Sequence, residues 1–326
     1  MTPEAAPEAT RFGHLRALVL AVLRLVLVPA ALIWIITQAV GAGWASHTSW
    51  DPSLLLLGLA VNQIALAVFA TRMQLVLRLF DVRIAWLPAL RIHLQSMFYF
   101  FALPMTVGLE IARFIKIRQL QPGATMLQMS SALLIDRLLG AGSALVVGLL
   151  CLPFVNLNAP VTVPAWGWLA AAGGALAVAG GAALLVPRSR QLIGDAWRLL
   201  SGRGPGIVGL FAVSLIMHVI FAAGVHVLAA GLGLPLAFVD TLFAVAGGLL
   251  LVAIPVSLAG LGPAEVGAAG LLLMMGYAPT VALVAGALPY LARLLGALEG
   301  AAWEFAESGS SAIVATRGLL AGRQSS

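Results

Sequence analysis

Ionisable side chains lie inside long apolar stretches of this sequence, where a charge is costly unless it has a partner or faces a polar cavity. Seven of them are the candidate residues of a binding site: Glu110, Arg113, Asp136, Arg137, Glu265, Arg293 and Glu299. The arginines would suit an anionic group such as a phosphate. The carboxylates could hold the arginines in place or relay protons.

The spacing of these residues indicates how they are used. Glu110 and Arg113 are three residues apart, so in a helix they share one face. Asp136 and Arg137 are neighbours, which do not face each other on a helix, so each is expected to have a partner elsewhere. Arg137 and Arg293 are predicted to lie deepest. The alternative to a binding site is structural ion pairing between helices.

The composition identifies the class of protein. The chain has 326 residues, of which 61% are hydrophobic and only 9% charged, against about 25% charge in a typical soluble domain. The net charge of +6 comes from basic residues in short gaps between apolar stretches, which is typical of membrane loops and argues against nucleic-acid binding. The single cysteine, Cys151, excludes an internal disulfide and a cysteine-based zinc cluster. No nucleotide-binding, metalloprotease or nucleophile-elbow motif is present, so no metal or cofactor is predicted.

The apolar stretches predict the membrane helices. A spanning helix needs about 20 apolar residues. Six stretches meet this length, at about 25–44, 53–78, 124–151, 164–186, 206–232 and 279–305. Two further stretches, 86–118 and 238–277, are interrupted near their middle, by Pro104 with Gly108 and by Pro255 with Gly260. These two are expected to be pairs of shorter helices.

Basic residues predict the orientation, because cytosolic loops are rich in Lys and Arg. Basic residues occur at the end of the second helix and at both ends of stretch 86–118: Arg72, Arg78, Arg83, Arg91, Arg113, Lys116 and Arg118. Others lie between stretches 164–186 and 206–232 and in the C-terminal tail: Arg188, Arg190, Arg198, Arg203, Arg317 and Arg323. Loops near 45–52, 152–163 and 233–237 have none. Both broken stretches are therefore predicted to be re-entrant hairpins from opposite faces, and both termini to be cytosolic.

The order of these elements predicts an internal repeat. Span, span, hairpin and span occur twice, the second time upside down, which is a common transporter architecture. The expected fold is an all-α polytopic membrane bundle of about six full spans and two re-entrant hairpins. The expected units are a disordered cytosolic tail at 1–16, a first repeat at 17–152, an inverted repeat at 153–305 and a cytosolic tail at 306–326. Residues 102–107 resemble residues 253–258 position by position, which is weak support for the repeat.

Three segments resemble motifs of the lysylphosphatidylglycerol synthase transmembrane-region family. The segment from Phe100 to Arg113 has the Pro, Gly, Glu and Arg of the first motif, with phenylalanine near the place of its usual asparagine. Leu133 to Gly140 resembles the acidic-Arg segment, and Ile254 to Glu265 the Pro-x-Ser segment, with Ala259 where glycine is common. The resemblance covers about 20–305 without the synthase domain.

The resemblance implies a flippase-like protein of the bacterial plasma (inner) membrane that moves an anionic or modified (glyco- or aminoacyl-) lipid between leaflets. A membrane lipid is then the substrate, and a lipid-modifying enzyme is a candidate partner. Two other functions stay open. One is a non-transporting partner of a lipid-modifying synthase or glycosyltransferase. The other is a membrane-embedded head-group enzyme that uses Glu110, Asp136 or Glu265 as acid or base, which the absence of a nucleophile or metal motif disfavours.

Overall fold

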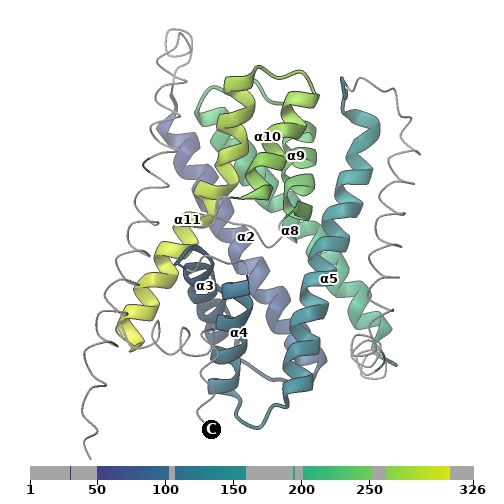
Figure 1. The fold of residues 1–326 in the computed structure, drawn as a ribbon, viewed down its shortest axis with the longest axis vertical. Coiled ribbons are helices and arrows are strands. Elements are labelled where there is room, and N and C mark those ends of the chain that lie inside the picture. Colours follow the sequence, from purple (N-terminus) through teal and green to yellow (C-terminus); the bar gives the residue numbers. More distant parts are fainter. Residues whose placement is uncertain are drawn as a thin grey trace, which may run out of the picture.

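The fold is a bundle of helices (Figure 1). The computed structural model describes residues 50–102, 107–158, 201–251 and 262–308, together with the single residues 30 and 194. Within these ranges there is no strand, which confirms the predicted all-α class. The predicted spans 25–44 and 164–186, the predicted tail 1–16 and most of the tail 306–326 lie outside the described residues, as does nearly all of the matched pair 102–107 and 253–258.

Among the described residues, four long helices have the length and composition to cross a membrane: α2 (Pro52–Leu79), α5 (Met126–Cys151), α8 (Gly204–Gly231) and α11 (Pro279–Ser308). They coincide with predicted spans to within three residues. Local signals set their starts. The Asp51 carboxylate accepts the Ser53 N–H at the start of α2, and Thr125 and Gln128 form a capping box at the start of α5. A short 3₁₀ turn, η2 (Leu152–Phe154), follows α5.

Four shorter helices replace the two broken stretches: α3 (Trp86–Ala102) and α4 (Val107–Leu120), then α9 (Phe238–Leu250) and α10 (Pro263–Met274). The helices end and restart where proline and glycine interrupt the sequence, as predicted. At about 1.5 Å per residue they are roughly 18–26 Å long, less than the ~30 Å hydrocarbon core of a bilayer.

Each pair of short helices folds back on itself as a hairpin, and α3 packs on α4 as α9 packs on α10. The open end of the first hairpin is closed by the Gln121 amide, which donates to the Arg83 carbonyl at 2.8 Å. The second is closed by the Tyr277 hydroxyl, which donates to Asp240 at 2.6 Å. Burial raises the pKa of Tyr277, so it remains a neutral donor. The α3–α4 hairpin lies in the lower half of Figure 1 and the α9–α10 hairpin in the upper half.

Helices α2 and α8 pack against each other, antiparallel, along an extensive contact. Gly224 allows this approach, because a Cβ there would overlap the Asn62 side chain. The two helices are joined at both ends. At one end the Asp51 N–H donates to the Gly231 carbonyl at 3.0 Å, and at the other Arg203 donates to the Leu79 carbonyl.

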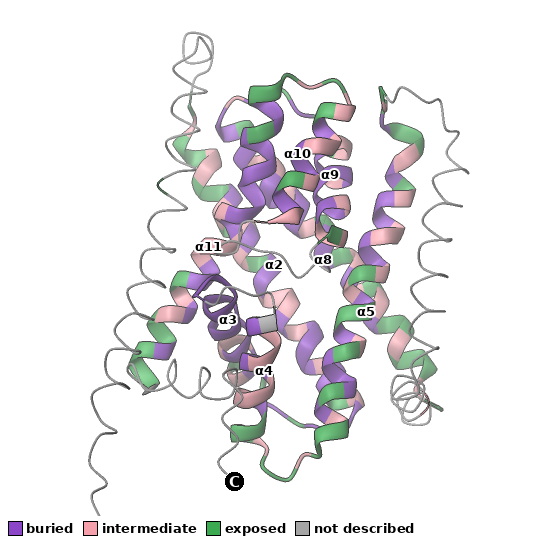
Figure 2. Ribbon diagram, in the orientation of Figure 1, coloured by how far each residue is buried: buried purple, intermediate pink, exposed green. Residues whose placement is uncertain are grey.

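Helix α3 is the most enclosed element and holds the first hairpin against α11. Every side chain from Ile92 to Ala102 is buried, as Figure 2 shows by the continuous purple of this helix. Gly300 of α11 lies directly on the Leu94 backbone, and a Cβ at this position would overlap it. The hairpin is therefore fixed to the core through α3. Helix α4 contacts its neighbour α5 only sparsely.

Candidate functional site

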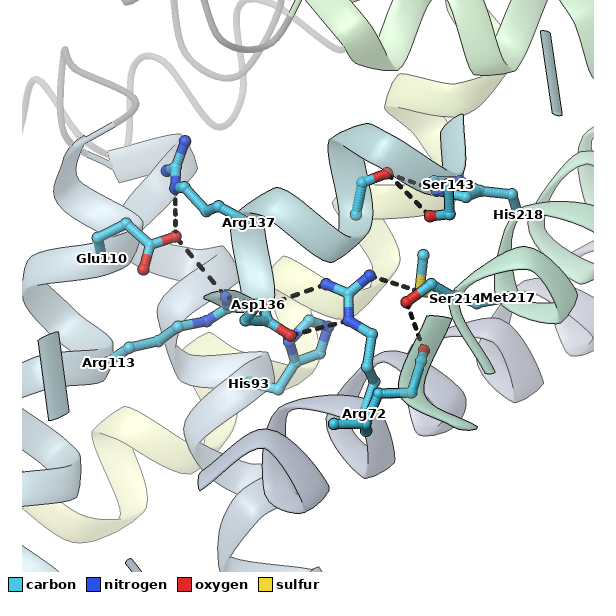
Figure 3. A network of polar contacts seen from close by, with 12 residues as sticks. Arg72, His93, Glu110, Arg113, Asp136, Arg137, Ser143, Ser214, Met217 and His218 are labelled. Carbon is cyan, nitrogen blue, oxygen red and sulfur yellow. Dashed lines mark hydrogen bonds and ion pairs between the residues drawn. The ribbon is translucent and has the colours of Figure 1, made fainter. Parts of the chain in front are cut away.

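Asp136, in the middle of α5, is the centre of a buried ionic network (Figure 3). Arg72 of α2 donates to it with two nitrogens, Nε to Oδ1 at 2.8 Å and Nη2 to Oδ2 at 3.0 Å. Both side chains are almost fully buried, at 6% and 4% exposed. This forked geometry is the strongest arrangement of an arginine with a carboxylate.

A second arginine, Arg113 of α4, reaches the same carboxylate from the other side. Its Nη1 lies 3.5 Å from Asp136 Oδ2 and 3.7 Å from Glu110 Oε1. The Glu110 carboxylate also accepts from Arg137 Nε at 2.9 Å. The contacts link α2, α4 and α5 into one network.

His93 of α3 completes the network and has a defined tautomer. Arg113 Nη2 lies 2.8 Å from His93 Nδ1, and since a guanidinium only donates, Nδ1 must be the acceptor. The ring proton is then on Nε2, which is buried and has no hydrogen-bond partner among the described residues. Ser96 on the same helix accepts from Arg113 Nε at 3.3 Å. We call the full set the Asp136 network; it comprises Arg72, His93, Ser96, Glu110, Arg113, Asp136 and Arg137.

The charges of the Asp136 network do not balance. Three guanidinium groups face two carboxylates, and His93 is neutral, so the network carries one positive charge in excess. Removing a buried partner from such a set leaves an uncompensated charge, which costs about 3–5 kcal/mol. Because the network has one positive charge in excess, a monovalent anion bound there would neutralise it.

A cavity of about 730 Å³ lies between α4 and α5, next to Glu110. Five of its lining residues are apolar, Ile111, Phe114, Ile115, Met126 and Leu133, and four are polar, Glu110, Arg118, Gln119 and Ser130. Glu110 belongs to both the cavity and the Asp136 network. We call this cavity the α4–α5 groove.

The predicted residues Glu265 and Arg293 form a second, separate ion pair between α10 and α11. Glu265 also accepts the Gly262 N–H at 2.8 Å, which fixes its carboxylate at the start of α10. Arg293 lies over the Phe100 ring, 5.8 Å from its centroid. Its Nε donates to the carbonyl of Pro289, the proline inside α11. Its side chain is 12% exposed.

The remaining predicted residue, Glu299, belongs to neither group. It accepts from the Gln63 amide of α2 at 2.7 Å, so it joins two long helices by one hydrogen bond. Two ion pairs lie further along α11. Glu304 is 2.7 Å from Lys116 of α4, and Glu307 is 2.5 Å from Arg91 of α3. These contacts attach the first hairpin to the end of α11.

The structure thus gathers the seven predicted residues into three groups and not into one site. The pairing of Asp136 and Arg137 with different partners is confirmed, and so is the shared face of Glu110 and Arg113. That Arg137 and Arg293 lie deepest in the membrane stays a prediction. Arg137 is near the middle of α5, about 100° around the helix from the buried Asp136, and its side chain is 42% exposed, whereas that of Arg293 is 12% exposed.

Three residues of the Asp136 network were not predicted. Arg72 was counted among the basic flanking residues, but it is 5% exposed inside α2, where Asp136 compensates its charge. Its place within the predicted span 53–78 was the available signal. His93 and Ser96 carry no such signal, because their role depends on a partner in another helix. No group of three His, Cys, Asp or Glu side chains that could hold a metal ion occurs within the described residues.

A family model supplies the comparison with known proteins. The model described as the lysylphosphatidylglycerol synthase TM region matches residues 18–296. No curated protein and no solved structure matches the chain. The matched range includes the whole Asp136 network, the α4–α5 groove and the Glu265–Arg293 pair.

Proposed function

Because the chain belongs to the lysylphosphatidylglycerol synthase transmembrane-region family, we propose that it is a flippase-like protein that moves an anionic or modified lipid between leaflets. The observation that carries this proposal is the Asp136 network beside the α4–α5 groove. A lipid needs a polar place for its head group and an apolar place for its chains, and here the two are adjacent.

The charge of the network supports a head group that contains a phosphate. The network has one positive charge in excess, and its most accessible cation is Arg137, which is 42% exposed and pairs with Glu110 of the groove. A guanidinium matches a phosphate with two parallel hydrogen bonds. The apolar lining, including Ile111, Phe114 and Leu133, suits an acyl chain.

The arrangement in the membrane is part of the proposal. Four helices, α3, α4, α9 and α10, are too short to span a bilayer, which supports two re-entrant hairpins. The two hairpins lie in opposite halves of Figure 1, which supports an inverted repeat. Arg78, Arg83 and Arg203 gather at the α3–α4 end, so we assign that end, and both termini, to the cytosol of a bacterial inner membrane.

We propose transport without chemistry on the lipid, so the test measures movement. The full chain is reconstituted in liposomes that contain fluorescent phosphatidylglycerol, and lipid that reaches the outer leaflet is counted by a membrane-impermeant quencher. The expected result is translocation faster than in empty liposomes, and loss of that gain in Arg137→Ala. Arg83→Ala, which removes an exposed arginine in the α2–α3 turn, is the matched control and retains it.

Two outcomes contradict the proposal. Translocation equal to empty liposomes for phosphatidylglycerol, an aminoacylated lipid and a glycolipid would exclude a flippase. A deletion strain that lacks a lipid species, instead of having it on the wrong leaflet, would favour an enzyme or a synthase partner.

A further inference from the structure

The side chains that line the α4–α5 groove differ in exposure along its length. Where α4 ends and α5 begins, Arg118, Gln119 and Met126 are exposed. Further from this end, Glu110 is 21% exposed and Leu133 is buried. The groove is therefore most accessible near the connection between α4 and α5, and it becomes more enclosed towards the Asp136 network.

The groove follows two helices that run antiparallel (Figure 1). Arg118 is eight residues after Glu110, which places it about 12 Å further along α4. Ser130 is seven residues before Arg137, about 10 Å along α5 in the same direction. Because Glu110 and Arg137 are in contact at 2.9 Å, Arg118 and Ser130 lie at the same end of the groove.

Arg118 is a cation without a carboxylate partner. The other basic residues of α4 and α5, Arg113, Lys116 and Arg137, each form an ion pair. Arg118 forms neither an ion pair nor a hydrogen bond with any residue that the structure describes, and its side chain is exposed at the groove. Its charge is therefore free to meet an anion that enters from this end.

Two uncharged polar side chains lie with Arg118 at this end. The Gln119 amide can donate a hydrogen bond to a phosphate oxygen. The Ser130 hydroxyl donates to the Met126 carbonyl at 2.8 Å, so its oxygen remains an acceptor. These groups suit a phosphate that carries a neighbouring hydroxyl or ammonium donor, and the apolar residues further along the groove suit its acyl chain.

The second hairpin lacks such a cation. Glu265 lies in the first turn of α10, as Glu110 lies in the first turn of α4. Eight residues after Glu265 the chain has Leu273, which is 43% exposed, in the place of Arg118. A cation at this position is therefore not needed to build a hairpin of this kind, so Arg118 is available for another role.

From these observations we infer that Arg118, Gln119 and Ser130 form a loading site for a phospholipid head group, from which the phosphate passes to Arg137. The inference rests on the proposed function. The step of about 12 Å along α4 is close to half of the ~30 Å hydrocarbon core. The two arginines therefore give the phosphate a counter-charge at both ends of its path through one leaflet.

The first test measures how translocation depends on the amount of lipid, with the full chain in liposomes that contain a rising mole fraction of fluorescent phosphatidylglycerol. Arg118→Ala should raise the mole fraction at half-maximal rate about three- to fivefold, the range of one exposed ionic contact. The maximal rate should stay unchanged, because Arg137 still receives the head group. Arg118→Lys, which keeps the charge, should restore most of the affinity. Arg83→Ala, which removes an exposed arginine in the α2–α3 turn, is the matched control and should change neither value.

The second test locates the lipid. Phosphatidylglycerol with a photoreactive group on its head group should cross-link near Gln119 and Met126 in Arg137→Ala, where the loaded lipid cannot move on. The double variant Arg118→Ala/Arg137→Ala should lose this label. Glycerol phosphate in solution, at the same concentration as the lipid, should not displace it, because it lacks the acyl chains that the apolar lining holds.

Three results overturn the inference. One is a mole fraction at half-maximal rate that is the same in Arg118→Ala and Arg83→Ala. The second is a label near Gln119 that persists in the double variant. The third is displacement by glycerol phosphate, which would make this a site for a soluble phosphate. Failure of the proposed function is a separate observation: a label that depends on Arg118, but translocation no faster than in empty liposomes.

Discussion

The α4–α5 and α10–α11 seams place the same glutamate–arginine pair in two environments. At the first seam the pair borders an apolar groove and its arginine is 42% exposed; at the second it is packed between helices and its arginine is 12% exposed. The comparison teaches that the pair itself does not decide whether a seam is open. The residues beside it do, since Gly286 lies directly on Ala269 at the closed seam.

The largest expected effect comes from Asp136, the buried carboxylate that Arg72 and Arg113 share. Asp136→Ala leaves the buried Arg72 without its counter-ion and Arg113 with only Glu110, 3.7 Å away, and should lower the free energy of unfolding by about 3–5 kcal/mol. Thermal unfolding of purified protein in detergent measures this. Arg137→Ala, on the exposed side of the same helix, is the control. An unchanged midpoint for Asp136→Ala would mean that the two arginines find other partners.

The next effect compares the two glutamates directly. Glu265→Gln removes the counter-charge of the enclosed Arg293 and should cost about 1.5–3 kcal/mol. Glu110→Gln should cost less than about 1 kcal/mol, because Arg113 retains Asp136 and Arg137 is partly exposed. Unfolding in a denaturant series measures both variants. Equal losses would show that the two seams do not differ in burial in solution.

At Arg137 the expected effect on transport is larger than the effect on stability. Arg137→Ala should slow lipid translocation about tenfold, which corresponds to about 1.4 kcal/mol of lost head-group interaction. Its unfolding midpoint should change little, because Asp136 and Arg72 remain paired. Arg137→Lys should restore part of the rate, since it keeps the charge but loses the forked geometry. Equal rates in all three proteins would remove Arg137 from the lipid path.

The smallest effect concerns the ends of the hairpins. Tyr277→Phe removes the hydrogen bond to Asp240 that closes the second hairpin and should cost about 1 kcal/mol. Gln121→Ala removes the exposed bond that closes the first and should cost less. Hydrogen exchange at the start of α9 and of α3 measures the two losses. A larger effect for Gln121 would reverse the ranking of the two ends.

The sequence predicts much of the fold because the signals are local. The lengths of the apolar stretches predicted α2, α5, α8 and α11. Proline and glycine predicted the breaks that separate α3 from α4 and α9 from α10. Helical spacing also predicted that Glu110 and Arg113 share a face. Each of these depends on neighbours in the chain.

The composition of the site depends on distant neighbours, and there prediction was weaker. Arg72 looked like a flanking cation because its partner, Asp136, is 64 residues away on another helix. The 42% exposure of Arg137 could not be predicted, because position along a span does not reveal which side of the helix is covered by other helices. His93 could not be assigned at all, since only the contact with Arg113 fixes its tautomer.

The antiparallel packing of α2 on α8 has a consequence for how the chain assembles during synthesis. Helix α2 ends at Leu79 and its main partner begins at Gly204, 125 residues later. At a synthesis rate of about 5–20 residues per second, α8 begins to be made roughly 6–25 s after α2 is complete. Arg72 can meet Asp136 much earlier, because α5 is made before α8. The ionic contact therefore holds the early helices together until the later half of the chain arrives.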